Sequence, residues 1–193
     1  MMRIITSIKN YYAVNEKHIK QASKFLSLLL RHQPELIGLE LDAGGWANVQ
    51  ELIAKANEKG HSLSAGLLET VVATNDKQRF AFNEDHSRIR ASQGHSLEVE
   101  LNIQAAEPPE YLYHGTIAAF IEAIKKEGLQ KMSRQHVHLS REESTARNVG
   151  GRRGKPVILL VKALEMQQAG YLFYLSDNDV WLTEAVPPSF IIF

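Results

Sequence analysis

The feature that most constrains the fold is a change of pattern near the middle of the chain. Residues 105–109 read AAEPP, which is typical of a turn or short linker. Helical periodicity dominates before this segment, whereas short strands alternate with small helices after it. The chain has 193 residues, enough for two small domains. We therefore predict an α+β protein with two lobes, residues 1–104 and residues 105–193.

The first half reads as helices followed by a hairpin. Apolar residues at helical spacing follow a candidate N-cap at Asn15, and Pro34 predicts the end of that helix just after Arg31 and His32. Asn48 and Ser64 are predicted to cap two further helices, which run to about residues 59 and 75. Alternation in RFAF and SRIRA on either side of residues 83–86 predicts a two-stranded wing. This order resembles a winged helix, a helix-turn-helix variant that often binds nucleic acid.

The second half alternates strands and short helices. Strands are predicted at residues 110–115, 136–140 and 156–164, and a hairpin turns at residues 177–178. An amphipathic helix is predicted to end at Gly128, and a second short helix leads into the glycine-rich loop VGGRRG. This pattern suits a small α+β domain.

Composition excludes several classes of protein. The chain has no cysteine, which excludes disulfides, thiolate metal sites and cysteine nucleophiles. No apolar run approaches the roughly 20 residues of a membrane span, and the start lacks a signal-peptide pattern. We therefore expect a monomeric cytoplasmic protein that makes no membrane contact.

Charge is balanced overall but not locally. The chain carries 22 Lys+Arg and 22 Asp+Glu, whereas Lys125 to Lys155 holds nine basic and three acidic residues. Such a segment can bind phosphates, or it can simply be a solvated face.

Several residues of the first half could bind a phosphate. Arg31 and His32 stand at a predicted helix C-terminus, where they either complement the helix dipole or clamp a phosphate. Arg79 opens a strand, and Arg90 leads into the polar run QGHS, which contains His95 and Ser96. Each of these also has an ordinary interpretation as a surface side chain.

Two further motifs lie in the second half. His114, Gly115 and Thr116 end a predicted strand, where glycine lets the backbone approach a ligand closely. His138 and Ser140 share a strand face with His136, but no third ligand at informative spacing follows, so no metal is predicted. The loop with Arg152 and Arg153 lacks the P-loop pattern, and no Rossmann fingerprint is present.

The order of these segments is distinctive. LSLLLRHQPELIGLELDAGGWANVQELI, DKQRFAF, IRASQGHS, LYHGT, HVHLS, VGGRRGKPVIL and VWLTEAVPPSFI together resemble the RNA 2′-phosphotransferase family of the KptA type, which includes tRNA 2′-phosphotransferases. The resemblance covers residues 23–191 and implies a winged-helix RNA lobe followed by an ADP-ribosyltransferase-like lobe that binds NAD⁺. It also implies a role in tRNA processing.

The resemblance also implies roles for individual residues. An Arg-His-Arg-Arg set that acts on the phosphate falls on Arg31, His32, Arg79 and Arg152, of which Arg152 is chosen over the adjacent Arg153. A His-His-hydrophobic signature for NAD⁺ falls on His114, His138 and Val180. The remaining candidates are grouped as NAD⁺ contacts at Gly115, Thr116 and Ser140, and as RNA or phosphate contacts at Arg90, His95, Ser96 and Arg153.

The implied reaction consumes NAD⁺ as a co-substrate and needs no metal. The RNA 2′-phosphate displaces nicotinamide from the nicotinamide ribose, and the ribose 2″-hydroxyl then attacks the bridging phosphate. The products are RNA with a free 2′-hydroxyl and ADP-ribose 1″,2″-cyclic phosphate. Because the nucleophile is already anionic, a glutamate base is unnecessary, and an apolar residue suits that position.

Two other functions remain open from the sequence. One is an ADP-ribosyltransferase that modifies a protein or a nucleic-acid terminal phosphate and leaves a stable adduct. The other is a non-catalytic RNA-binding module, which predicts RNA binding that is indifferent to NAD⁺.

Overall fold

The computed structural model describes residues 2–75, 77–100 and 103–193, with side chains from residue 16 onward. The chain divides into two units, Met1–Leu101 and Asn102–Phe193, whereas the sequence placed a boundary between residues 104 and 105. Both units contain helices and strands, which confirms the predicted α+β class. Within the described ranges, no helix is both long enough and apolar enough to cross a membrane.

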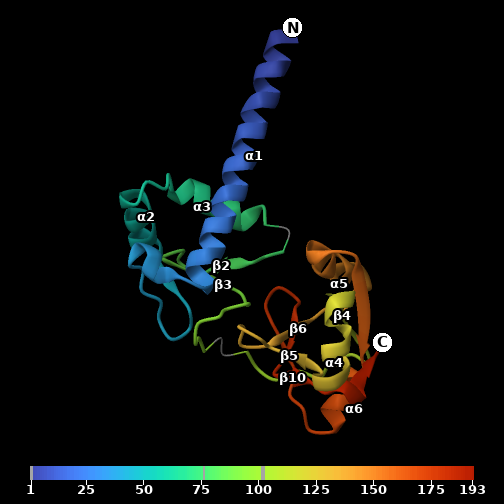
Figure 1. Cartoon of the computed structure of the whole chain (residues 1–193). Coiled ribbons are helices and arrows are strands. Elements are labelled where there is room, and N and C mark those ends of the chain that lie inside the picture. Colours follow the sequence, from blue (N-terminus) through green and yellow to red (C-terminus); the bar gives the residue numbers. More distant parts are fainter. Residues whose placement is uncertain (1, 76, 101–102) are drawn as a thin grey trace. The chain divides into compact units, whose positions relative to one another are not determined.

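In the described residues of the first unit there are three α-helices and a small antiparallel sheet (Figure 1). The sheet has the order β1-β3-β2, so the last strand along the chain lies in the middle. The elements are α1 (Met2–Arg31), η1 (Pro34–Ile37), β1 (Ala47–Asn48), α2 (Val49–Glu58), α3 (Ala65–Ala73), β2 (Phe80–Phe82) and β3 (Arg88–Ala91).

Local signals placed most of these elements correctly. The side chain of Asn48 accepts a hydrogen bond from the amide of Glu51 at 3.0 Å, and that of Ser64 accepts one from Leu67 at 3.2 Å. These contacts satisfy amides that a helix N-terminus leaves without partners, which confirms both predicted caps. The hairpin predicted around residues 83–86 is also confirmed, because β2 and β3 pair antiparallel.

The predicted start of α1 was wrong. The helix begins at Met2 rather than after a cap at Asn15. Residues 2–33 contain neither glycine nor proline, so nothing in that stretch interrupts a helix. Its end is as predicted, because Arg31 is the last helical residue and Pro34 opens the following 3₁₀ turn.

The core of the first unit forms on one face of α1. Leu26, Leu29 and Leu30 are completely buried at the predicted helical spacing. They belong to a cluster with buried residues of α2, α3 and the sheet, including Leu52, Leu68 and Ile89. This cluster fixes the C-terminal end of α1 relative to the hairpin.

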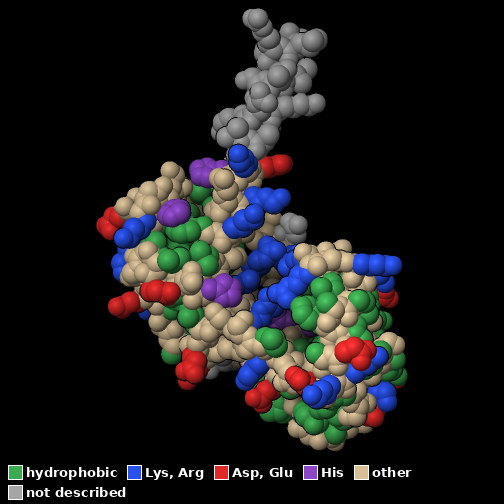
Figure 2. Space-filling view, in the orientation of Figure 1, with side chains coloured by type: hydrophobic (Ala, Val, Ile, Leu, Met, Phe, Trp, Pro, Cys, Tyr) green, Lys and Arg blue, Asp and Glu red, His purple; other side chains and the backbone are tan. Residues whose placement is uncertain are grey.

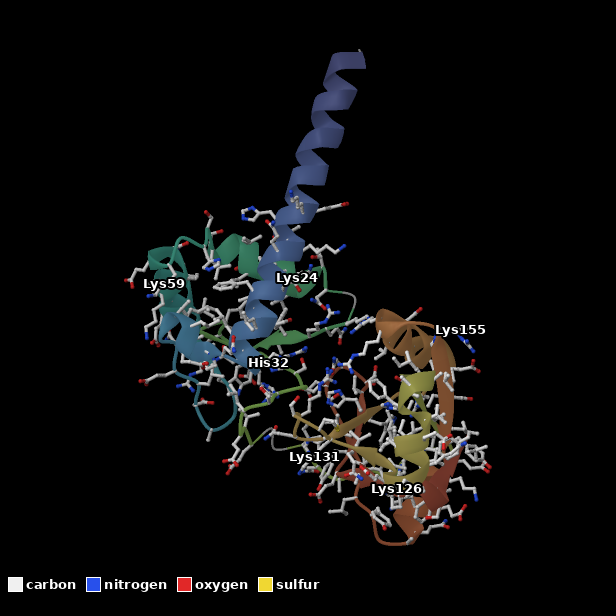
Figure 3. All side chains as sticks on the ribbon, viewed as in Figure 1. Lys24, His32, Lys59, Lys126, Lys131 and Lys155 are labelled. Carbon is white, nitrogen blue, oxygen red and sulfur yellow. The ribbon has the colours of Figure 1, made fainter. Side chains whose placement is uncertain are left out.

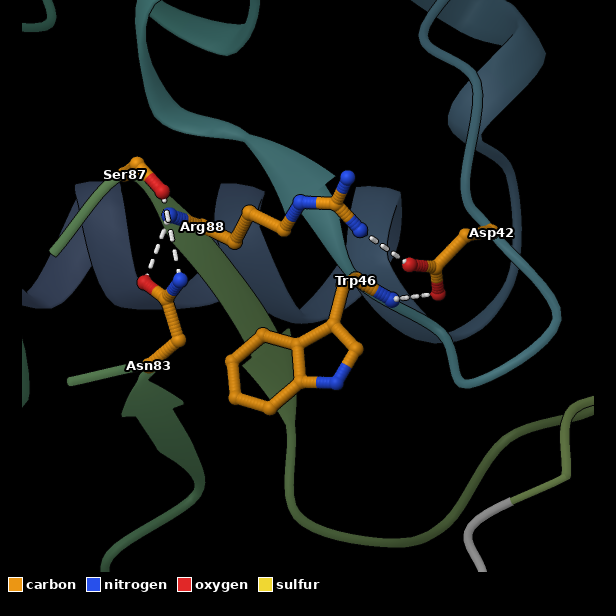
Figure 4. Close-up of polar contacts among 5 residues, drawn as sticks. All are labelled: Asp42, Trp46, Asn83, Ser87 and Arg88. Atoms are coloured by element: carbon orange, nitrogen blue, oxygen red, sulfur yellow. Dashed lines mark hydrogen bonds and ion pairs between the residues drawn. The ribbon is translucent and has the colours of Figure 1, made fainter. Parts of the chain in front are cut away.

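Side-chain contacts hold the hairpin turn and the loop before β1 (Figure 4). Asp42 accepts from Arg88 Nη1 at 2.6 Å through one carboxylate oxygen and from the amide of Trp46 at 2.9 Å through the other. Asn83 accepts from the amide of Arg88 at 2.8 Å and donates to Ser87 Oγ at 3.2 Å. The contacts fix the position from which the Trp46 indole projects.

From residue 103 onward, the second unit contains two three-stranded sheets and one two-stranded sheet. Their orders are β11-β7-β4, β6-β9-β8 and β10-β5, and a bridge between Tyr113 and Ser140 connects β4 to the end of β6. The elements are β4 (Leu112–Ile117), η2 (Ala118–Phe120), α4 (Ile121–Glu127), β5 (Leu129–Gln130), β6 (Val137–Leu139), α5 (Glu143–Gly150), η3 (Gly151–Arg153), β7 (Pro156–Val161), α6 (Ala163–Gln168), β8 (Tyr174–Leu175), β9 (Trp181–Thr183), β10 (Ala185–Val186), η4 (Pro188–Phe190) and β11 (Ile191–Ile192).

Helix α5 packs on β4 with almost no space between the two backbones. A Cβ atom added to Gly115 would overlap the carbonyl group of Ala146 in α5, and one added to Gly150 would lie 2.9 Å from the carbonyl carbon of Gly115. The lack of a side chain at Gly115 therefore allows the close approach of α5, and a ligand contact at Gly115 stays a prediction.

We predict that Gly115→Ala destabilises the second unit by about 3 kcal/mol, because the added methyl group forces β4 and α5 apart. The chain has two tryptophans, and in a Trp46→Phe background Trp181 alone reports urea unfolding of the second unit by fluorescence. Gly66→Ala is the matched control, because an added Cβ at that helical position meets no atom within 4 Å. Equal stability of the two variants would contradict the packing described.

Candidate functional site

Several predicted residues of the first unit lie at the C-terminal end of α1, where Figure 3 labels His32. The amide of Ser96 donates to the carbonyl oxygen of Arg31 at 2.9 Å, and Ser96 Oγ lies 2.9 Å from Nδ1 of His32. Ser96 Oγ also donates to the Arg31 carbonyl at 3.4 Å, which leaves it to accept from Nδ1 of His32. The QGHS segment therefore lies against Arg31 and His32. The sequence had related these residues only through the order of their motifs along the chain.

Arg79 lies beside the same helix end. Nη2 of Arg31 donates to the carbonyl oxygen of Arg79 at 3.4 Å, and Nη1 of Arg79 donates to Oδ1 of Asn75 at 3.3 Å. Asn75 in turn donates to Ser23 Oγ of α1 at 3.3 Å. Asn75 therefore orients the guanidinium of Arg79, a role that sequence reasoning missed because it treated this residue only as a helix end.

Arg90 is held by an aromatic ring. Its guanidinium carbon lies 4.6 Å from the centroid of the Trp46 ring, which is a cation–π contact. The two residues are far apart in the sequence, and only the pairing of β3 with β1 and β2 brings them together. Trp46 was not among the predicted residues, and its stacking restrains the direction of the Arg90 side chain.

His95 is buried among these cations and is not a surface histidine. Its exposed fraction is 1%, and neither ring nitrogen has a hydrogen-bond partner in the described part of the chain. Burial, reinforced by the charges of Arg31, His32 and Arg90, lowers the pKa of His95 to about 4. The ring is therefore neutral at pH 7, which limits the positive charge packed at the end of α1.

His114 has a defined tautomer in the second unit. Its Nδ1 donates to the carbonyl oxygen of His138 at 3.1 Å, so Nε2 is the acceptor of the neutral ring. Burial lowers the pKa of His114, the His138 carbonyl opposes this shift, and the charge of Arg134 adds to it. His114 and Thr116 lie on the face of β4 opposite Gly115, and therefore opposite α5.

His138 lies in β6, and Ser140 directly follows this strand where it is bridged to β4. Tyr113 and Ser140 exchange two backbone hydrogen bonds of 2.8 and 2.9 Å. Val137 and Leu139 are buried while His138 and Ser140 are half-buried, which confirms the predicted alternation. His138 pairs with Leu182 of β9, and Val180 directly precedes that strand.

No group of three or more His, Asp or Glu side chains is arranged to hold a metal in the described residues. The ring of His136, the other histidine of this face, packs at 5.8 Å against Tyr174. Burial lowers the pKa of His136, the charge of Lys131 adds to this, and Glu184 opposes it. These contacts give His136 a packing role.

Some basic residues between Lys125 and Lys155 form ion pairs with acidic side chains in the described part of the chain, and others do not. Ion pairs join Lys125 to Glu122 at 2.9 Å, Lys131 to Glu184 at 3.3 Å, and Arg147 to Glu143 at 2.5 Å. Both acidic and basic side chains are visible on the surface of the second unit (Figure 2).

Four arginines of this segment form no ion pair with an acid in the described residues: Arg134, Arg141, Arg152 and Arg153. Arg152 and Arg153 lie exposed in η3. Burial lowers the pKa of Arg134, and the charges of Arg153 and Arg152 add to this shift. Arg134 was missed, because in the sequence it is one basic residue among many.

The sequence matches known proteins over most of its length. Residues 17–185 match the family model described as RNA 2′-phosphotransferase, Tpt1/KptA family. A probable RNA 2′-phosphotransferase of Flavobacterium johnsoniae is 61% identical over 180 residues, which cover 93% of this chain and 99% of that protein. Another, of Rhodopirellula baltica, is 55% identical over 179 residues, covering 92% and 97%.

We predict that His95 makes the protein sensitive to mild acid. Its folded pKa of about 4 lies below the ordinary 6.5, so the unfolded chain binds the proton more readily as pH falls from 6.5 towards 4. Between pH 7 and 4.5 the wild type should therefore lose about 2.5 kcal/mol of unfolding free energy through this residue. Urea unfolding at both pH values measures the loss.

His95→Leu and His95→Gln are the comparison variants, because neither side chain titrates. Each should lose about 2.5 kcal/mol less than the wild type between the two pH values, whatever its stability at pH 7. A pH dependence identical to that of the wild type in both variants would show that His95 is not held neutral.

Proposed function

Because the chain belongs to the RNA 2′-phosphotransferase, Tpt1/KptA family, we propose that it removes a 2′-phosphate from RNA and consumes NAD⁺ as the co-substrate that receives it. The observation that carries the proposal is the cluster of Arg31, His32 and Arg79 at the end of α1. Two guanidiniums and an imidazole held by neighbouring side chains suit the oxygens of a phosphate monoester.

The proposed reaction has two steps whose atoms balance. An oxygen of the RNA 2′-phosphate bonds to the anomeric carbon of the nicotinamide ribose, and nicotinamide leaves with the electron pair of the broken C–N bond. The ribose 2″-hydroxyl then attacks the bridging phosphorus and gives up its proton, while the RNA 2′-oxygen leaves and gains one. The second step shifts charge onto phosphate oxygens, where fixed arginines stabilise it.

Each residue of the first unit has a definite part in this proposal. Arg31 and Arg79 donate to phosphate oxygens, and Asn75 holds the Arg79 guanidinium in place. His32, oriented through Nδ1 by Ser96, either donates to the phosphate or transfers the proton of the attacking hydroxyl. Arg152 of the second unit is the fourth residue proposed to act on the phosphate.

The second unit offers groups that fit a dinucleotide. The neutral ring of His114 presents Nε2 as an acceptor, which suits a ribose hydroxyl, and Thr116 lies on the same face of β4. We place Gly115, His138, Ser140 and Val180 in the same NAD⁺ site. The apolar Val180 fits a reaction whose nucleophile is already an anion.

The family resemblance supports two finer descriptions. The helix order of the first unit and its β2–β3 hairpin support a winged-helix RNA lobe, in which Arg90, His95 and Ser96 serve the RNA or its phosphate. Arg153 of the second unit is proposed to serve the same ligand. We propose an ADP-ribosyltransferase-like fold for the second unit. A cytoplasmic location, a monomeric state and a role in tRNA processing stay predictions.

The test of this function is incubation of the purified protein with a short RNA that carries one internal 2′-phosphate, with and without NAD⁺. Loss of the phosphate only with NAD⁺, together with nicotinamide and ADP-ribose cyclic phosphate, is the expected result. An RNA that stays ADP-ribosylated would favour a terminal-phosphate or protein ADP-ribosyltransferase. Binding without any NAD⁺-dependent change would favour a non-catalytic RNA module.

We predict that Arg79→Ala lowers the rate of phosphate removal by about 10²–10³-fold, because one preorganised donor to the phosphate is lost. Single-turnover kinetics with saturating NAD⁺ measure the rate. The matched control is Arg88→Ala on the neighbouring strand, where the lost arginine is exposed and paired with Asp42. Near-normal activity of Arg79→Ala would contradict the proposed phosphate clamp.

A further inference from the structure

The small sheet of the first unit has an inner and an outer face. Along β3, the side chains of Ile89 and Ala91 are completely buried, and they belong to the same core cluster as Leu26 of α1. Arg88 and Arg90 alternate with them and are at least partly exposed. The core therefore lies on the inner face, and the outer face presents its side chains to solvent.

Trp46 extends the outer face. Ala47 of β1 pairs with Ile89 of β3. One residue further along this antiparallel register, Trp46 comes opposite Arg90, which agrees with the 4.6 Å between the indole centroid and the guanidinium carbon. The indole is partly exposed, and Figure 4 shows it in front of the ribbon of β3. On the other side of Arg90 the sheet carries Ala81, whose side chain is a single methyl group.

The loop before β1 holds Trp46 in place. The amide of Trp46 donates to Oδ1 of Asp42 at 2.9 Å, and its carbonyl oxygen accepts from the amide of Asp42 at 3.0 Å. A Cβ atom added to Gly45 would lie 3.5 Å from Nε2 of His95, so the loop lies against the histidine that is buried at the end of α1. A ring that is already held in position loses little conformational freedom when a ligand stacks on it.

The outer face is continuous with the proposed phosphate clamp. Two residues after Arg90, the amide of Ser92 donates to the carbonyl oxygen of Arg79 at 2.9 Å. A strand rises about 3.3 Å per residue, so the backbones of Arg90 and Ser92 are roughly 7 Å apart. This separation is comparable with the span of one extended nucleotide. A nucleotide next to the one whose phosphate is clamped can therefore reach Trp46.

The chemistry of the pair favours a nucleobase. Proteins that bind single-stranded RNA stack its bases on aromatic rings and on the planes of arginine guanidinium groups. Such stacking accepts any base, because every base has a π face. The positive charge of Arg90 also complements the polyanion that carries the base.

We propose that Trp46 and Arg90 form a stacking site for the nucleobase next to the nucleotide that carries the 2′-phosphate. The inference rests on the proposed function, because it takes 2′-phosphorylated RNA as the substrate. The site adds affinity for a phosphate that lies within an RNA strand, and it does so without reading the base sequence.

Trp46→Leu tests the site, because leucine is apolar but has no flat ring. We expect this variant to bind a short single-stranded RNA with one internal 2′-phosphate about tenfold more weakly than the wild type, measured by fluorescence anisotropy without NAD⁺. Trp46→Phe should recover most of the affinity. The matched control is Tyr171→Leu, which removes a partly exposed ring that packs on Phe190 in the second unit and should bind this RNA as the wild type does.

Two further RNAs distinguish stacking from support of the loop. Each carries the 2′-phosphate but lacks the base of the nucleotide on its 5′ or its 3′ side. One of them should bind the wild type about tenfold more weakly than the intact RNA does and should bind Trp46→Leu equally, because both changes remove the same contact. In a Trp181→Phe background, where Trp46 is the only tryptophan, the intact RNA should quench the fluorescence more than this abasic RNA.

The outcomes separate this inference from the proposed function. If Trp46→Leu bound every RNA as the wild type does, the inference would be overturned while NAD⁺-dependent phosphate removal stands. Equal weakening for the intact and both abasic RNAs would also overturn it, since Trp46 would then only support the loop and Arg90. A wild type that shows the stacking but leaves the 2′-phosphate in place with NAD⁺ would overturn the proposed function alone.

Discussion

The hydrogen bond from the Ser96 amide to the Arg31 carbonyl organises the first unit. A helix leaves its last carbonyl oxygens without partners inside the helix. Here one of them accepts hydrogen bonds from Ser96, which lies in a loop 65 residues further along the chain. The same loop residue orients His32 through its hydroxyl, and the residue before it, His95, is buried beside Arg31. One satisfied carbonyl thus places four candidate residues together: Arg31, His32, His95 and Ser96.

The contact of α5 with β4 has the corresponding effect in the second unit. Because Gly115 and Gly150 carry no side chain, the helix occupies one face of the strand completely. His114 and Thr116 must then use the other face, where the carbonyl of His138 receives the ring of His114. The tautomer of His114 therefore follows from backbone packing as well as from its own chemistry.

Sequence reasoning succeeded where the determining interactions are local. Asn48 and Ser64 cap helices through amides three residues away, and the burial of α1 follows its own periodicity. It failed where the partner is distant or where no stop signal exists. The start of α1 was placed too late because no glycine or proline marks it, and the close packing of α5 on Gly115 was not foreseen.

For the candidate site too, the sequence indicated some residues and not others. The arginines and histidines could be found from their order along the chain, because the resemblance assigns each of them by motif. Their supporting residues could not, since Asn75 reaches Ser23 across 52 positions and Trp46 meets Arg90 only after the sheet forms. Arg134 lies four residues from His138, but the contact depends on a loop that turns back on its strand.

The two units have one electrostatic feature in common. Each holds arginines close to a histidine that burial keeps uncharged, His95 in the first and His114 in the second. A charged imidazole in either place would add to the repulsion among the guanidiniums, whereas a neutral one fills space without charge. The guanidiniums can then bind an anion such as a phosphate ester or a pyrophosphate. The proposed transfer of a phosphate onto a fragment of NAD⁺ would use such attraction for both the RNA and the dinucleotide.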